Sequence, residues 1–123
     1  MSWRIHDLVN REKTFKVNAW NWRPTLEILK TFGILDEDRL ERMQYNITVS
    51  VSSEEARGIA EQFERRFLSK MTAADRVRLD LTLTDEPDDF QIHDDDLKNY
   101  GATEEWLQKF TDFCRSCNGF EIG

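Results

Sequence analysis

Two cysteines near the end of the sequence have the spacing of a reactive pair. Cys114 and Cys117 form C-x-x-C, which occurs in redox dithiols and as half of many zinc sites. A reactive thiolate is commonly stabilised at a helix N-terminus, whereas Asn118-Gly119 predicts that these thiols lie in the last turn of a helix. Zinc would need two more ligands, and His6 and His93 are distant in the sequence. We therefore expect both cysteines to be buried as small apolar side chains.

A second candidate is the acidic segment, residues 85–96, which reads DEPDDFQIHDDD. Seven of the 24 acidic residues lie in it, and the rest of the chain has 17 acidic residues against 17 Lys and Arg. The whole net charge of −7 therefore comes from this segment. Clustered carboxylates can hold a hard cation, but Phe90 stands where a calcium loop requires glycine. A solvated loop, a recognition surface for a basic partner and a weak cation site stay open.

His93 lies among the carboxylates of the acidic segment. An adjacent carboxylate could raise its pKa and make it a general acid or base. No Ser or Cys nucleophile is tied to either histidine by a recognisable motif. A small metal-dependent enzyme or metal binder that uses His93 and neighbouring carboxylates is therefore the alternative function. Our main expectation is a non-enzymatic protein without a cofactor, with no catalytic or metal-binding residue assigned.

Aromatic side chains gather in the stretch NAWNWRPT, residues 18–25. Trp20 and Trp22 with Arg23 are typical of a binding surface, because Trp, Tyr and Arg dominate the energy of protein interfaces. The same pattern also fits a structural role at the edge of the core. The predicted binding residues combine the acidic segment with three aromatic residues: Asp85, Glu86, Asp88, Asp89, His93, Asp94, Asp95, Asp96, Trp20, Trp22 and Tyr100.

Hydrophobic periodicity predicts the elements that must position these residues. Strands are expected at residues 3–8, 14–20, 46–52, 77–84 and 120–122. Helices are expected at residues 24–33, 53–70 and 103–117, with a further short helix at 36–43. Pro24 suits a first helical turn, and Ser52 with Glu55 forms a capping box. In 77–84 the leucines alternate with polar residues, which predicts one packed and one solvated face.

These elements predict an α+β fold. Strands and helices mix without regular alternation, and the strands have the pattern of half-buried ones. We expect a single domain over residues 1–123, with a mostly antiparallel sheet of four to five strands. Two main helices, 53–70 and 103–117, and one shorter helix, 24–33, are expected to pack against that sheet.

Four stretches together resemble a family of small bacterial proteins over nearly the whole chain: NAWNWRPT, SSEEARGIAEQF, LTDEPDDF and YGATEEWLQKFTDFCRSCNGFEI. The resemblance implies a bacterial source, and no activity is established for that family. In size, charge and lack of a catalytic motif the chain is also similar to the acidic immunity proteins that neutralise bacterial toxins.

Charge and composition narrow the expected partners. The acidic segment predicts a protein partner with a basic surface, as for an immunity protein and its toxin. Direct nucleic-acid binding is disfavoured because the basic residues are dispersed among acidic ones. The sequence has no apolar run of membrane-spanning length, and two cysteines are no disulfide framework, so we expect a cytoplasmic protein. A homodimer joined by the aromatic face of the last helix is a further possibility.

Overall fold

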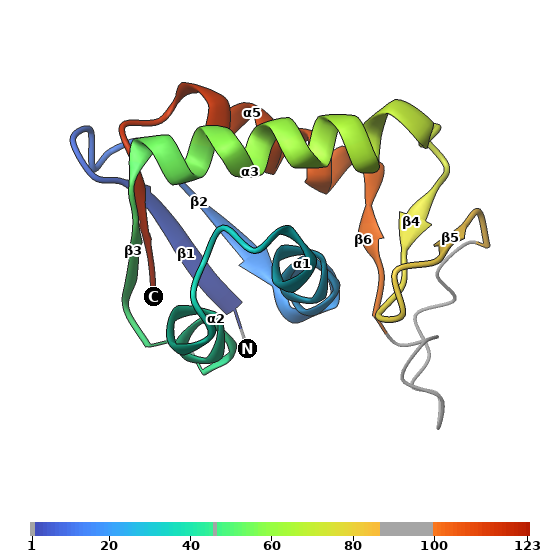
Figure 1. Cartoon of the computed structure of the whole chain (residues 1–123), viewed down its shortest axis with the longest axis horizontal. Helices are drawn as coiled ribbons and strands as arrows, with labels where there is room; N and C mark the ends of the chain where they lie inside the picture. Colours follow the sequence, from blue (N-terminus) through green and yellow to red (C-terminus); the bar gives the residue numbers. More distant parts are fainter. Residues whose placement is uncertain (1, 46, 87–99) are drawn as a thin grey trace.

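The larger sheet has four antiparallel strands in the order β2-β1-β7-β3. The structure is a computed structural model that describes residues 2–45, 47–86 and 100–123 (Figure 1). The strands are β1 (Ser2–Asp7), β2 (Thr14–Asn18), β7 (Phe120–Ile122) and β3 (Val49–Val51). The antiparallel α+β class is therefore confirmed.

Alternation of side chains gives this sheet one buried and one solvated face. Trp3 lies opposite Val17, and Ile5 lies between Phe15 and Ile122. Trp3, Ile5, Val17 and Ile122 are almost fully buried, whereas Arg4 on the other face is exposed. This period of two follows from the geometry of a strand, in which successive side chains point to opposite faces.

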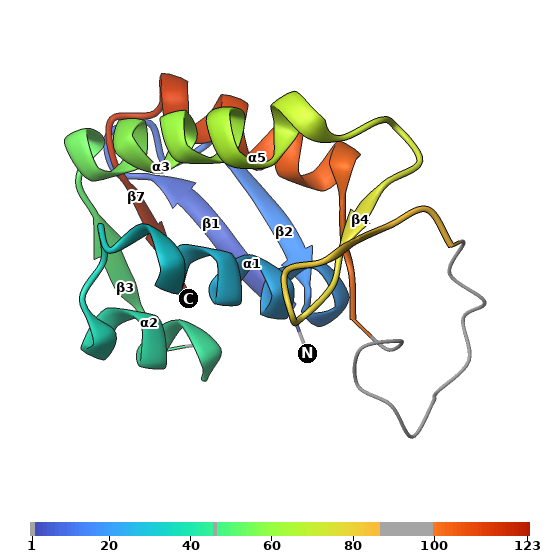
Figure 2. The ribbon, with the colours of Figure 1, turned by 45° about the vertical axis from the view of Figure 1, so that its right-hand side comes forward.

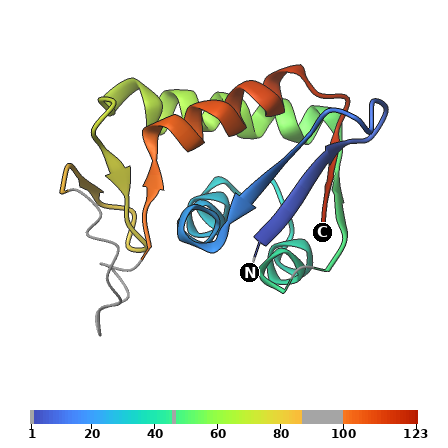
Figure 3. The ribbon, with the colours of Figure 1, turned by 180° about the vertical axis from the view of Figure 1, so that it is seen from behind.

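Helices α1 (Ala19–Phe32), α2 (Glu37–Gln44), α3 (Ser53–Arg66) and α5 (Glu104–Ser116) supply the rest of the framework. Helices α3 and α5 run side by side, as the views from the front and from behind both show (Figures 1 and 3). The predicted Ser52–Glu55 capping box is present at the start of α3. This helix ends earlier than expected and continues as the short 3-10 helix η1 (Leu68–Lys70).

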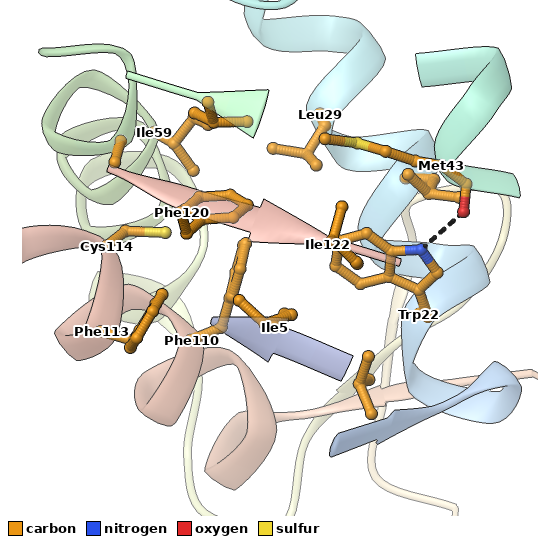
Figure 4. Close-up of a cluster of buried hydrophobic side chains, with 14 of the residues drawn as sticks. Ile5, Trp22, Leu29, Met43, Ile59, Phe110, Phe113, Cys114, Phe120 and Ile122 are labelled. Carbon is orange, nitrogen blue, oxygen red and sulfur yellow. Dashed lines mark hydrogen bonds between the residues drawn. The ribbon is translucent and has the colours of Figure 1, made fainter. Parts of the chain in front are cut away.

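The core is formed mainly by aromatic and aliphatic side chains from the sheet and four helices. Phe110 of α5 contacts Phe63, Trp22 and Phe120 with ring centroids 5.8 to 5.9 Å apart. Figure 4 shows the resulting cluster, in which Ile5 of β1 also takes part. The aromatic face of the last helix is thus inside the molecule, since Phe110 is 0% exposed. That face is packed against the core of its own chain, and a homodimer stays a prediction.

A second, smaller sheet corrects the strand predicted at residues 77–84. It has the order β5-β4-β6, with β4 (Arg76–Val77), β5 (Leu83–Thr84) and β6 (Ala102–Thr103). The carboxylate of Asp80 accepts hydrogen bonds from the N–H and hydroxyl of Thr82, and this local turn reverses the chain. Leu81 has a φ of 70° in this turn, so the leucines do not share one buried face.

Helix α1 also begins earlier than predicted. It starts at Ala19, and the side chain of Asn18 accepts a hydrogen bond from the N–H of Asn21. Pro24 therefore lies inside the helix and not in its first turn, and β2 ends at Asn18. The sequence was misread here because Asn18 fitted an alternating strand pattern, although asparagine is also a preferred helix cap.

Candidate functional site

The predicted binding residues are only partly within the described structure. Asp88, Asp89 and the run 93–96 lie outside the described residues, whereas Asp85 and Glu86 are exposed. Trp22 is 0% exposed, and its indole N–H donates to the carbonyl of Met43 at 3.2 Å. Trp22 is therefore a core residue and cannot contribute to a binding surface. For Trp22, the structural role that the pattern NAWNWRPT also fitted is confirmed.

Trp20, Arg23 and Tyr100 come together on the surface, although 77 residues separate Arg23 from Tyr100 in the chain. The rings of Trp20 and Tyr100 lie 5.3 Å apart between centroids. The guanidinium carbon of Arg23 lies 4.7 Å from the centre of the Tyr100 ring, and its Nη1 donates to the phenol oxygen at 3.1 Å. Because the ring face carries partial negative charge, the cation stabilises the position of Tyr100. Trp20 is still 45% exposed, so nearly half of its surface has no cover among the described residues.

The backbone of α1 fixes the chain that follows the acidic segment. Pro24 has no N–H, so the carbonyl of Trp20 has no helical partner at that position. The N–H of Gly101 donates to this carbonyl at 3.0 Å. The side chain of Asn21 in the same turn accepts from the N–H of Thr103 at 3.0 Å. The first turns of α1, where Pro24 leaves a carbonyl without a helical donor, thus bind the backbone that follows Tyr100.

The start of the acidic segment is held by two arginines of the small sheet. Arg76 donates to the carbonyl of Glu86 at 2.8 Å, and Arg78 forms an ion pair with the Glu86 carboxylate at 3.2 Å. Arg76 also packs against Gly101, since a Cβ at that glycine would lie 3.2 Å from the arginine Nη1. Both flanks of the acidic segment therefore meet at Arg76.

A hollow of about 400 Å³ lies beside this cluster. Trp3 and Leu26 contribute apolar atoms to it, and Tyr45 stands on its rim with 64% of its surface exposed. The full lining comprises residues of β1, α1, the end of α2 and the segment after the acidic run: Trp3, Ala19, Arg23, Leu26, Glu27, Gln44, Tyr45 and Tyr100. We call the exposed residues Trp20, Arg23 and Tyr45, together with the half-buried Tyr100, the aromatic surface.

Sequence reasoning did not identify Tyr45 as a site residue. The signal available was an aromatic residue two positions after the short helix predicted at 36–43, on the polar side of its pattern. Its proximity to Tyr100 depends on the packing of α2 against α1, which no local pattern specifies.

The C-x-x-C pair is buried, as predicted. Cys114 is 0% and Cys117 1% exposed, and the sulfur of Cys114 points toward the ring of Phe120 (Figure 4). Burial raises the pKa of both thiols, and for Cys117 it outweighs the hydrogen bond from the Gly119 backbone, which lowers the pKa. Both cysteines are free, and each thiol therefore stays protonated and unreactive at neutral pH.

Metal binding and membrane crossing can be assessed for the described residues. No group of three or more His, Cys, Asp or Glu side chains lies in that part of the chain in an arrangement that could hold a metal ion. Within residues 2–45, 47–86 and 100–123, every helix is too short or too polar to cross a membrane.

No model of a known protein family, no curated protein and no solved structure matches this chain. The function must therefore be argued from the aromatic surface and the charges beside it.

Proposed function

We propose that this protein is a non-enzymatic binding module whose aromatic surface and adjacent acidic segment together engage a basic protein partner. The observation that carries the proposal is the exposed Trp20 ring, which lies against Tyr100, while Arg23 covers the Tyr100 ring shortly after the acidic segment. Trp, Tyr and Arg are the residues that most often provide binding energy at protein interfaces. The neighbouring carboxylates supply long-range attraction and orientation for a basic surface.

In this proposal the aromatic side chains provide the contact area, and the carboxylates provide the long-range attraction. Trp20 and Tyr100 share contact area, and the cation of Arg23 holds Tyr100 in place, so little ordering entropy is lost on binding. Arg76 contacts Glu86 and Gly101, which stand before and after residues 87–99, and we propose that the acidic charges act next to the aromatic surface. A basic toxin of the kind that immunity proteins neutralise has the required chemistry.

We propose a cytoplasmic site of action, where free thiols such as Cys114 and Cys117 persist.

Partner capture from an extract of the native cells tests the aromatic contribution. The double variant Trp20→Ala/Tyr100→Ala is expected to lose at least 90% of the captured partner, because interface hot spots contribute roughly 2 kcal/mol or more each. The control is Val9→Ala, since Val9 is 74% exposed and lies in the β1–β2 turn. Thermal melting of each variant establishes that it is folded. Equal capture by the double variant and the wild type would exclude the aromatic surface as the binding site.

The same capture experiment tests the acidic contribution. One variant removes four carboxylates from the segment: Asp88→Asn, Asp89→Asn, Asp94→Asn and Asp95→Asn. The charge-matched control removes four carboxylates from other elements: Glu12→Gln, Glu54→Gln, Glu61→Gln and Glu105→Gln. We expect the segment variant alone to lose the partner, and wild-type capture to weaken as salt screens the charges. If the segment variant recovers the same proteins as the wild type, the acidic segment is not the recognition element.

A further inference from the structure

The hollow beside the aromatic surface is one end of a longer groove between α1 and α2. A second hollow of about 640 Å³ lies between the same helices, and Gln44 lines both hollows. The two helices lie side by side, and Trp22 near the start of α1 donates to Met43 near the end of α2, so they are antiparallel (Figure 2). The groove therefore follows the length of the helix pair.

Helical spacing on both sides supports one continuous groove. The lining residues of α1 and its C-cap recur at intervals of three and four: Ala19, Arg23, Leu26, Glu27, Lys30 and Gly33. The lining residues of α2 recur in the same way: Glu37, Leu40, Glu41 and Gln44. Residues at this spacing share one helix face. With 14 residues, α1 is about 21 Å long, which matches a helical segment of about four turns.

The floor and the rim of this groove differ in chemistry. Leu26, Leu35 and Leu40 line it at 2 to 6% exposure, so they form its floor. On the α1 rim, Glu27 is paired with Lys30 at 3.0 Å. On the α2 rim, Glu37 and Glu41 are one helical turn apart and form no ion pair within the described part of the chain. The groove therefore has an apolar floor and one uncompensated acidic rim.

We propose that this groove binds an amphipathic helix with basic residues along one edge. Apolar side chains of that helix enter the two hollows, and Lys or Arg residues spaced by four face Glu37 and Glu41. Recognition of an amphipathic helix by an apolar groove uses such anchors at intervals of three and four. The proposal rests on the proposed function, because it specifies the part of the basic partner that continues from the aromatic surface. Charge complementarity with the α2 rim is what selects a basic helix as the occupant.

A designed peptide tests the groove without the native partner. The probe is a 14-residue helix with leucines on one face and lysines spaced by four, and the control peptide has the same composition in scrambled order. We expect the probe to shift amide NMR signals of α1 and α2 in the wild-type protein. The indole N–H signal of Trp3, which lines the groove, is expected to shift, whereas that of Trp106, bonded to Thr25 at 2.9 Å, stays in place.

Matched variants separate groove binding from general attraction to an acidic protein. Glu37→Gln/Glu41→Gln is expected to weaken the probe by roughly tenfold, the effect of removing two partly exposed charge pairs. Glu54→Gln/Glu105→Gln removes the same charge from α3 and α5 and is expected to change the affinity less than twofold. Equal affinities of the two variants, or shifts that lie outside α1 and α2, would overturn the proposal.

Three other outcomes are distinguishable. If light scattering shows a dimer whose groove amides are shielded, the occupant is a second copy of the chain and the proposal is wrong. If the probe fails while partner capture still depends on Trp20 and Tyr100, only the groove assignment falls and the proposed function stands. If the probe binds but the Trp20→Ala/Tyr100→Ala variant captures as well as the wild type, the proposed function falls.

Discussion

Asp7 is the buried carboxylate that connects the β1–β2 turn to the end of α5. It is 1% exposed and accepts hydrogen bonds from the N–H groups of Val9, Asn10 and Asn118 at 2.8 to 2.9 Å. Burial alone would raise its pKa, but these N–H groups outweigh that effect and hold the pKa at about 2. Sequence reasoning missed this role, because Asn118 is 111 residues away.

The depressed pKa of Asp7 predicts a loss of stability in acid. The charged form is favoured in the folded state, so its contribution is complete above the ordinary pKa of about 4 and is lost as the pH falls through about 2. We expect Asp7→Asn to lower the free energy of unfolding by about 2 kcal/mol at pH 7. Between pH 4 and pH 2 the free energy of unfolding of this variant should fall less than that of the wild type. Urea unfolding of both proteins across this range measures the difference. Parallel pH curves would show that Asp7 is not responsible.

At the scale of elements, Arg39 of α2 joins three parts of the fold. Its Nη1 donates to Glu55 in the α3 capping box at 2.8 Å and to the carbonyl of Ser50 in β3 at 3.3 Å, and its Nε pairs with Asp36. The Arg39 hydrogen bond, with a further one from Ser52, holds the pKa of Glu55 at about 2. The position of α2, and with it one wall of the groove, depends on this charged network.

Substitution of Arg39 tests that dependence. Arg39→Met is expected to lower the free energy of unfolding by about 1 to 2 kcal/mol, because Glu55 loses a bidentate, charge-assisted pair of hydrogen bonds. Arg42→Met is the control on the same helix, since Arg42 pairs with Asp38 at the open surface and should cost less than about 0.5 kcal/mol. Chemical denaturation compares the two. Equal costs would contradict a structural role for the Arg39 network.

Elements with a strong local signal could be predicted from the sequence. The capping box at Ser52 and the amphipathic face after it defined α3, and Asn118-Gly119 correctly marked the end of α5, where Gly119 has a φ of 86°. The strand at 77–84 was wrong because the Asp80 turn competes with the alternating pattern. The start of α1 was wrong because Asn18, its N-cap, fitted a strand pattern, and the Trp20 carbonyl that Pro24 leaves without a helical donor is bound by Gly101, far along the chain.

The sequence indicated which kinds of residue form the candidate site, but not which of them are exposed and in contact. Trp20 and Tyr100 were chosen from the sequence, and their contact is present. Trp22 was chosen by the same reasoning and is buried, because it lies on the inner side of α1 beside Met43. The hollow and Tyr45 could not be predicted, since they arise where α1, α2 and β1 meet.

At the scale of the whole molecule, the described residues on the two sides of the acidic run, Glu86 and Gly101, lie close to the aromatic surface. The acidic segment carries the net charge of −7, and its two flanks meet at Arg76 next to the aromatic surface. The β1–β2 turn with Val9 is at the other end of the two strands, because Ser2 pairs with Asn18 directly before Trp20. A partner that binds through both features must therefore contact position 20 and leave position 9 free.

Site-specific photocrosslinking measures this directly. A photoreactive phenylalanine analogue is placed at position 20 in one protein and at position 9 in another, and each is irradiated in an extract of the native cells. We predict a crosslink at position 20 to a basic segment of one partner, which is lost when the acidic segment is neutralised, and none to that partner at position 9. A partner that crosslinks at position 9 and not at position 20 would contradict the central claim.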